Sequence, residues 1–286
     1  MGDIDLTGQV AVVTGGGGGI GRGIALGLAR RGADVAVIDI DPERASRVVA
    51  AVEALGRRAV ARAVDVMDTA ALTGSIEATA GTFGRLDVLV NNAGGVSGRR
   101  FVEQSERSWR RHVDINLISM FAATSAAVPH MIRGGRGGSI VNVASIEATR
   151  AAPMFAVYAA CKAGMLSFTR TMAVELGEHG IRVNAICPDW TRTPGNSGTR
   201  SGPVDEPLPD RDGPLVARLR AYVPLGREGR TEECGDVAAF LCSSMASYVT
   251  GASIPVDGGT WASSGWLRAD DGDWTLFGPD HSMRDR

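Results

Sequence analysis

Short apolar segments rich in β-branched residues alternate with segments of helical periodicity over the first 190 residues. This alternation is typical of β-α-β units, in which helices join consecutive parallel strands. The expected strands are apolar throughout, as in a sheet with helices on both faces. The pattern therefore predicts an open, doubly wound α/β fold. We expect strands at 10–14, 34–40, 59–64, 87–91, 139–144 and 182–186, and the first two helices at 19–31 and 41–55.

The chain has 286 residues, 44% of them hydrophobic, which is enough for one large core. We expect a single domain over 1–260 and a tail over 261–286 that holds three of the five tryptophans. Because so much aromatic surface is costly to leave in water, we expect the tail to dock on its own domain or on a neighbouring subunit. The Gly-, Pro- and Asp-rich stretch at 193–214 is either a mobile lid over a site or a disordered surface insertion.

Charge and hydropathy exclude several classes of partner. The formal net charge is −2 and no Lys- and Arg-rich run of five or more residues is present, which argues against nucleic-acid binding. The acidic start has no apolar signal-peptide core, and no stretch approaches the roughly 18 apolar residues of a membrane span. Leu6 stands where a myristoylation signal has Ser or Thr. We therefore expect a cytoplasmic protein without membrane or nucleic-acid partners.

The cysteines are scattered, without a C-x-x-C pair or a histidine at metal-ligand spacing. We expect no metal site. The four residues Cys161, Cys187, Cys234 and Cys242 are expected to be small buried side chains. Cys187 is an alternative candidate for a reactive thiol, although no basic partner is visible beside it.

Five consecutive glycines at 15–19 lie between the first expected strand and the first expected helix. Glycine permits torsions that other residues avoid and lets main-chain N–H groups approach a pyrophosphate at a helix N-terminus. Gly16, Gly18 and Gly21 satisfy the G-x-G-x-x-G spacing, although a run of five glycines satisfies many patterns. The place of the run between a strand and a helix nevertheless indicates a dinucleotide-binding turn.

Asp39 ends the second expected strand, 18 residues beyond Gly21. A carboxylate there can accept hydrogen bonds from both hydroxyls of an adenosine ribose and repels a 2′-phosphate, which favours NAD over NADP. Alternatively, Asp39 only caps the strand end, and Arg22 is the one basic residue close enough to weaken the preference. Asp65, after the third strand, is a candidate partner of the adenine amine or an Asx-turn residue.

Tyr158 and Lys162 are four residues apart and fall on one face of a helix. A nearby ammonium favours the phenolate, so we expect Lys162 to lower the pKa of Tyr158 and make proton exchange with a substrate hydroxyl feasible. A single Y-x-x-x-K spacing often occurs by chance in a sequence of this length. However, Lys162 is the only lysine among the 30 basic residues, and an arginine has a different shape and donor geometry.

Several motifs, in this order, resemble the short-chain dehydrogenase/reductase family in its shorter, single-domain branch. They are T-G-x-x-x-G-I-G at 14–21, N-N-A-G at 91–94, Ser145 and Y-x-x-x-K at 158–162, within a resemblance that covers about residues 6–260. It implies a Rossmann-like parallel sheet, usually of seven strands, with the last strand ending near D-G-G at 257–259. It also implies a homotetramer or a dimer.

The resemblance implies a role for individual side chains. Tyr158 would be the general acid/base, Lys162 would hold the nicotinamide ribose and lower the tyrosine pKa, and Ser145 would bind the substrate oxygen. Asn116 would support a proton relay, unless it only satisfies helix backbone. The residues implied in cofactor binding are Gly15, Gly18, Gly19, Ile20, Gly21, Asp39, Ile40, Asp65, Val66, Asn92, Ala93, Gly94, Tyr158, Lys162, Pro188 and Thr193.

The chain departs from the family pattern after the sixth strand. Where the family commonly has Pro-Gly, this chain has Pro188, Asp189 and Trp190. Asp189 would either change the local backbone or present a carboxylate to the substrate. Trp190 is either core packing or a wall of the substrate site. Thr193 still matches the family residue that binds the carboxamide.

We expect reversible hydride transfer between NAD(H) and a small secondary alcohol or ketone, with Tyr158 exchanging the hydroxyl proton. Asp39 favours alcohol oxidation as the physiological direction, because cellular NAD pools are mostly oxidised. One alternative is a reductase of 3-oxoacyl thioesters, which would prefer NADPH and need a basic patch for an acyl carrier. A second alternative is a cofactor-binding regulator without catalysis.

Overall fold

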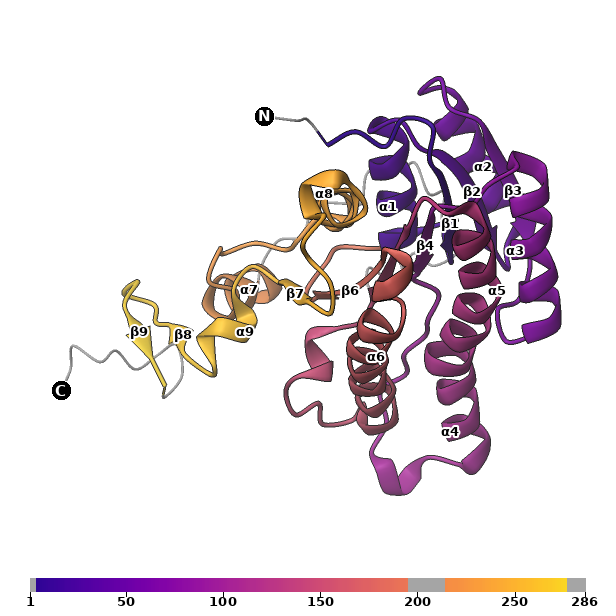
Figure 1. Ribbon diagram of the computed structural model, residues 1–286. Helices are drawn as coiled ribbons and strands as arrows, with labels where there is room; N and C mark the ends of the chain where they lie inside the picture. Colours follow the sequence, from indigo (N-terminus) through magenta and orange to yellow (C-terminus); the bar gives the residue numbers. More distant parts are fainter. Residues whose placement is uncertain (1–3, 195–213, 277–286) are drawn as a thin grey trace.

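The computed structural model describes residues 4–194 and 214–276. The strands of its main sheet are β1 (Val10–Thr14), β2 (Asp34–Asp39), β3 (Ala59–Ala63), β4 (Val88–Asn91), β5 (Gly138–Val143), β6 (Ile181–Pro188) and β7 (Ser253–Val256). They form one parallel sheet in the order β3-β2-β1-β4-β5-β6-β7 (Figure 1). The predicted fold class and the seven strands are confirmed. β6 runs beyond the expected end at 186, because its last residues pair with β7.

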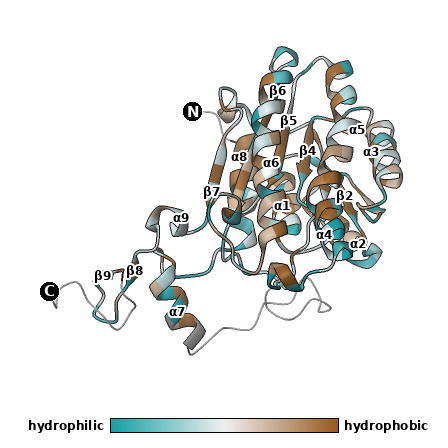
Figure 2. Ribbon diagram, turned by 90° about the horizontal axis from the view of Figure 1, so that it is seen from below, coloured by the Kyte–Doolittle hydropathy of each residue, from teal (hydrophilic) through white to brown (hydrophobic). Residues whose placement is uncertain are grey.

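Helices cover both faces of this sheet. The helices of the described residues are α1 (Gly19–Arg30), α2 (Pro42–Glu53), α3 (Thr69–Phe83), α4 (Glu106–Val113), α5 (Ser119–Gly134), α6 (Ala156–Glu175), α7 (Pro214–Tyr222), α8 (Thr231–Cys242) and α9 (Thr260–Ser263), of which six pack on the sheet. α1, α2 and α8 pack on one face, and α3, α5 and α6 pack on the other. Along β1, Ala11 and Val13 enter the first core and Val12 enters the second. This two-sided burial explains why most strands are apolar throughout (Figure 2).

Local signals fix the ends of the first helices. The Asp41 carboxylate accepts hydrogen bonds from the Glu43 and Arg44 N–H groups, and Pro42 occupies the first turn of α2. Gly32, at φ +100°, ends the turn after α1. β3 differs from the expectation that the strands are covered by helices on both faces. It lies at the edge of the sheet, and its side chains stay partly exposed.

Chain order reverses between β1 and β4, which are neighbours at the centre of the sheet. The connections from β1 lead outward to β2 and β3, whereas those from β4 lead to β5, β6 and β7. In doubly wound folds this reversal opens a crevice at the carboxyl ends of the strands, where ligands bind. The expected catalytic and cofactor residues follow these strand ends.

One helical run, 106–134, is long and apolar enough to cross a membrane by length and composition. Its most apolar 18-residue window has a mean hydropathy of 1.4, so the expectation that no stretch approaches a span is wrong on composition. The physical reason is that α5 is a core helix: 44% of the window is buried in the fold, where Ala123, Ala127 and Met131 pack against the sheet. Core helices pass the same test as membrane helices, so the run is weak evidence for a membrane.

The tail continues from α9 into a hairpin of β8 (Leu267–Arg268) and β9 (Trp274–Thr275). The hairpin lies beyond α7, away from the main sheet (Figure 1). Trp261, Trp266 and Trp274 are 52%, 39% and 36% exposed, and docking of the tail stays a prediction. Most of the expected lid at 193–214 lies outside the described residues.

Asp34, at the start of β2, binds Arg57 and Arg58, the two residues that directly precede the edge strand β3. Its buried carboxylate accepts hydrogen bonds from Arg58 N (3.0 Å), Arg58 Nε (2.8 Å) and Arg57 Nη2 (3.0 Å). Burial alone would raise the pKa of Asp34, but the hydrogen bonds from Arg58 and the charges of Arg57 and Arg58 lower it below 3.8.

Replacing this carboxylate, Asp34→Asn, is expected to lower the free energy of unfolding at pH 7 by about 1–3 kcal/mol, because charged hydrogen bonds are lost. Since the folded pKa is lowered, the carboxylate stabilises the fold above pH 3.8 and this contribution is lost as pH falls through the folded pKa. Urea unfolding at pH 7 and pH 3 measures both effects, with exposed Glu53→Gln as the control. Equal losses of stability at both pH values would contradict this account.

Candidate active site

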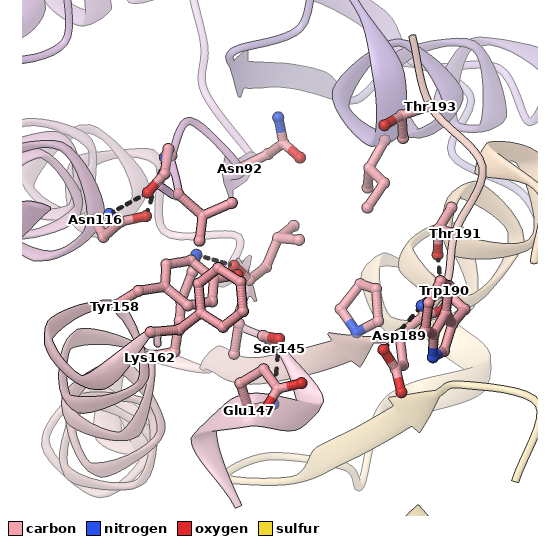
Figure 3. Close-up of a pocket in the computed structure, with 18 residues that line it drawn as sticks. Asn92, Asn116, Ser145, Glu147, Tyr158, Lys162, Asp189, Trp190, Thr191 and Thr193 are labelled. Carbon is pink, nitrogen blue, oxygen red and sulfur yellow. Dashed lines mark hydrogen bonds between the residues drawn. The ribbon is translucent and has the colours of Figure 1, made fainter. Parts of the chain in front are cut away.

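A cavity of about 600 Å³ opens at the carboxyl ends of β4, β5 and β6 (Figure 3). Tyr158 and Lys162 of α6 lie on one side of it, and Asp189 and Trp190 lie on the other. Ser145, which follows β5, lies between them. The cavity therefore brings the three expected catalytic residues together with the segment that departs from the family pattern.

The glycine turn leads into this cavity at Ile20. A Cβ at Gly17 would lie 2.8 Å from the Asp39 carboxylate, and one at Gly21 would collide with the Gly15 carbonyl oxygen. Gly18 is the N-cap of α1 and provides no side-chain hydrogen bond. The first N–H groups of α1 are thus not covered by a capping side chain, as pyrophosphate binding requires.

The N-N-A-G segment fixes the glycine turn to the centre of the sheet. Thr14 Oγ1 donates to the Val90 carbonyl (3.2 Å) and accepts from the N–H groups of Asn92 (3.0 Å) and Ala93 (3.1 Å). The Asn92 amide donates to the carbonyls of Thr14 (2.9 Å) and Gly15 (3.0 Å). Asn92 thus positions the loop that would face a cofactor.

Asp39 is placed where the sequence analysis expects it, at the end of β2 beside the glycine turn. Its Oδ2 accepts from Gly17 N–H (2.9 Å) and its Oδ1 from Asp41 N–H (3.0 Å). Each carboxylate oxygen retains one lone pair for a further donor. The neighbouring Ile40 is 67% exposed, leaving an apolar surface next to this carboxylate.

Asp65 forms the Asx turn that was one of its two interpretations. Its Oδ1 accepts from Met67 N–H at 3.0 Å, and the intervening Val66 is buried. Its contact with an adenine stays a prediction.

Ser145 Oγ accepts from Glu147 N–H (3.2 Å), and the Ser145 hydroxyl lies close enough to Tyr158 to act on the pKa of its phenol. Lys162 Nζ donates to the Val143 carbonyl (2.8 Å) and lies 5.7 Å from the centre of the Tyr158 ring. The three side chains form one contiguous polar group at the end of β5.

Electrostatics at Tyr158 correct one expectation. Burial raises the pKa of Tyr158, the Ser145 hydroxyl opposes this rise, and the charges of Glu147 and Asp189 add to it. Burial also lowers the pKa of Lys162 to about 8. The expected lowering of the Tyr158 pKa is therefore wrong for the protein alone: burial raises this pKa, and the Lys162 ammonium is bound to the Val143 carbonyl and lies over the Tyr158 ring.

Asn116 lies in a π-helical turn, Asp114–Ile118, between α4 and α5. Its Nδ2 donates to the carbonyls of Gly95 (2.8 Å) and His112 (3.0 Å), and its Oδ1 accepts from Gly95 N–H (3.2 Å). This geometry supports the alternative role of satisfying backbone groups, here in its own helix and in the loop after β4. Participation in a proton relay stays a prediction.

Asp189 and Trp190 show how the chain replaces the family's glycine. The positive φ falls on Trp190 (+41°), while Asp189 accepts from Arg150 Nη2 (2.9 Å) and Thr260 Oγ1 (2.8 Å). Burial raises the pKa of Asp189, against the lowering effects of Thr260 and Arg150. Trp190 lines the cavity and packs edge-on against Tyr222 at 6.1 Å, so it is a wall of the site.

Thr193 and Pro188 both line the cavity, as expected of cofactor-binding residues, and Thr193 lies against Gly19 of the glycine turn. All four cysteines are buried, and burial raises the pKa of Cys187 to about 11, which argues against a reactive thiol. Among residues 4–194 and 214–276, no group of three His, Cys, Asp or Glu side chains could hold a metal.

Sequence reasoning missed several residues of the site. Glu147, Val96 and Phe155 line the cavity, and Arg150 joins Glu147 to Asp189 behind it. The position of Glu147, two residues after Ser145, is a signal that could have been used. Arg150 carries no such signal in a chain where nearly every basic residue is arginine.

Comparisons with known proteins agree with this geometry. Residues 15–260 match a family model described as enoyl-(acyl carrier protein) reductase. The 3-oxoacyl-[acyl-carrier-protein] reductase of Thermotoga maritima is 38% identical over 256 residues, which cover 89% of this chain and 98% of that protein.

Two solved structures have the same architecture. A putative short-chain alcohol dehydrogenase from Sinorhizobium meliloti is 40% identical, with a TM-score of 0.83 over 91% of this chain and 98% of that one. Carveol dehydrogenase from Mycobacterium avium, in complex with NAD, is 35% identical, with a TM-score of 0.80 over 90% and 99% of the two chains. The fold, the arrangement of the motifs and these similarities together establish that the chain is an oxidoreductase of the short-chain dehydrogenase/reductase family.

Proposed function

We propose that this protein transfers a hydride between a secondary alcohol or ketone and NAD(H), with Tyr158 as the general acid/base. The observation that carries the proposal is the meeting of Ser145, Tyr158 and Lys162 in one cavity with a glycine turn that ends beside Asp39. The nicotinamide cofactor, when bound, supplies the carbon that accepts or donates the hydride.

The glycine turn and Asp39 are the groups of this chain that fit a dinucleotide. The N-terminus of α1 has no capping side chain and would receive a pyrophosphate, for which Gly17 and Gly21 leave close access. The free lone pairs of Asp39 suit ribose hydroxyls and its charge disfavours a 2′-phosphate. The carveol dehydrogenase similar to this chain was solved with NAD.

The proton step follows from the positions of Ser145 and Tyr158. In oxidation, the Tyr158 phenolate accepts the hydroxyl proton of the alcohol, while Ser145 holds the same oxygen in place. In reduction, the phenol returns that proton to the carbonyl oxygen. Because the pKa of Tyr158 is raised, the neutral phenol is its resting form. We propose oxidation as the physiological direction, since cellular NAD is mostly oxidised, and Tyr158 must then lose its proton before it can act as a base.

Reduction of 3-oxoacyl thioesters is the second candidate, favoured by the similarity to the Thermotoga reductase. Asp39 argues against it, because an NADPH-dependent reductase would be expected to avoid a carboxylate at this position. A non-catalytic regulator is the third candidate. It has no evident need for Ser145, Tyr158 and a buried Lys162 in one cavity, and a buried lysine is costly.

We also propose that the chain forms a homotetramer or a dimer. Large apolar side chains remain exposed on α5 and α6: Phe121 is 37% exposed and Val174 is 82% exposed, and Phe121 packs on Phe168 at 4.8 Å. Such a face is favourable to cover with a second copy.

Removing the carboxylate in Asp39→Ala is expected to reduce the preference for NAD⁺ over NADP⁺ by about tenfold or more, because charged hydrogen bonds and the repulsion of a 2′-phosphate are lost together. Calorimetric titration with each cofactor measures the two Kd values, and exposed Glu43→Gln on α2 serves as the control. An unchanged ratio in Asp39→Ala would assign NAD selection to other residues.

Replacing the acid/base group, Tyr158→Phe, is expected to lower kcat by at least about 100-fold on a panel of secondary alcohols, measured as NADH absorbance. NAD⁺ binding should persist, because the glycine turn and Asp39 are untouched. Binding of NAD⁺ without turnover of any alcohol by the unmodified protein would favour the regulator. Turnover of 3-oxoacyl thioesters with NADPH would favour the second candidate.

A further inference from the structure

Glu147 brings a carboxylate to the cavity next to the catalytic serine (Figure 3). Its backbone N–H donates to Ser145 Oγ at 3.2 Å, so the two residues are joined directly. Its Oε1 accepts from Arg150 Nη2 at 2.8 Å. The other carboxylate oxygen, Oε2, accepts no hydrogen bond from any residue that the structure describes. Because Glu147 lines the cavity, this oxygen is available to a ligand there.

Arg150, which is not among the residues that line the cavity, fixes the position of the Glu147 carboxylate. The same Nη2 donates to Asp189 Oδ2 at 2.9 Å, and Nη1 donates to the Tyr222 hydroxyl of α7 at 2.7 Å. Arg150 thus joins three segments that are far apart in sequence. Glu147 is held by an ion pair that is about one-quarter exposed, which restricts its rotamers and prepares its free oxygen for a ligand.

The remaining wall around Glu147 is largely apolar. Val96, Phe155 and Trp190 line the same cavity, and the indole of Trp190 is fixed by its edge-on contact with Tyr222. Apolar walls with a few convergent polar groups are typical of small-molecule sites, where the polar groups determine orientation. Besides Ser145 and Tyr158, the free oxygen of Glu147 is well placed to do this.

The charges on this wall do not balance. Arg150 carries one positive charge and is shared by two carboxylates, Glu147 and Asp189, so this cluster has a net charge of −1, while the ammonium of Lys162 lies across the cavity beside Tyr158. A substrate carboxylate at this wall would be repelled, whereas a hydroxyl would find a charged acceptor.

We propose that Glu147 is a specificity-determining residue whose free carboxylate oxygen accepts a hydrogen bond from a second hydroxyl of the substrate. The substrate class is therefore a neutral alcohol or ketone with a hydroxyl on the carbon next to the reacting one, a vicinal diol or its hydroxyketone. We place the second hydroxyl on the neighbouring carbon because Glu147 follows Ser145, which would hold the reacting oxygen, by only two residues and both residues line the same cavity. This inference rests on the proposed function.

The test compares three forms of one carbon skeleton that the alcohol panel shows to be turned over: the mono-alcohol, the vicinal diol and the hydroxy acid. For a six-membered ring these are cyclohexanol, trans-1,2-cyclohexanediol and 2-hydroxycyclohexanecarboxylate. Initial rates of NADH formation by the full chain give kcat/KM for each. We expect the diol to exceed the mono-alcohol by about tenfold, from one charged hydrogen bond, and the hydroxy acid to be slowest.

In Glu147→Gln the ratio of diol to mono-alcohol should fall toward one, with the change mainly in KM. The ratio is the informative quantity, because the charge of Glu147 also raises the pKa of Tyr158 and its removal changes the rates of all substrates together. Glu175→Gln, an exposed position at the end of α6, is the matched control and should keep the unmodified ratio.

The outcomes separate this inference from the proposed function. Absence of turnover on every skeleton overturns the proposed function and this inference with it. Turnover in which the unmodified protein prefers the mono-alcohol or the hydroxy acid, or in which Glu147→Gln keeps the ratio, overturns the role of Glu147 alone. If Glu147→Gln does not fold, as judged by circular dichroism, the ratios of the unmodified protein still decide.

Discussion

The hydrogen bonds between the end of β1 and the loop after β4 are the contact on which the site depends. Thr14 Oγ1 accepts hydrogen bonds from two main-chain N–H groups of that loop. The Asn92 side-chain amide in turn donates to the carbonyls of Thr14 and Gly15. These bonds lie where chain order reverses in the sheet. They hold the glycine turn of one half of the fold against the segments of the other half that carry the catalytic residues.

Around this junction the protein accepts groups that a stable core would avoid. Lys162 is buried, and burial lowers its pKa to about 8. Its ammonium has the Val143 carbonyl as partner, which satisfies one donor. Asn116 occupies a π-helical turn, and Trp190 has a positive φ. Features that lower the free energy of unfolding in this way cluster at functional sites, where the surrounding structure holds them in place and the reaction uses them.

Much of this organisation could be predicted from the sequence, because it depends on local periodicity and on motifs close in the chain. The parallel sheet and the Asp41 cap belong to this group, whereas the number of seven strands and the meeting of Ser145 with Tyr158 and Lys162 were implied by the resemblance to the short-chain dehydrogenase/reductase family. Contacts between distant segments could not be predicted. Arg150 meets Asp189 and Tyr222 only in the folded chain, and the raised pKa of Tyr158 depends on burial that no short motif encodes. The positive φ of Trp190 likewise could not be predicted, because it depends on the path of the folded chain.

The central claim is direct hydride transfer at the junction of the two halves, and isotope transfer tests it most directly. A secondary alcohol that carries deuterium on its carbinol carbon is incubated with the protein and NAD⁺, and the reduced cofactor is analysed by mass spectrometry. We predict one deuterium in the nicotinamide ring for each ketone formed. Reduced cofactor without deuterium, or ketone formed without reduction of the cofactor, would contradict the account.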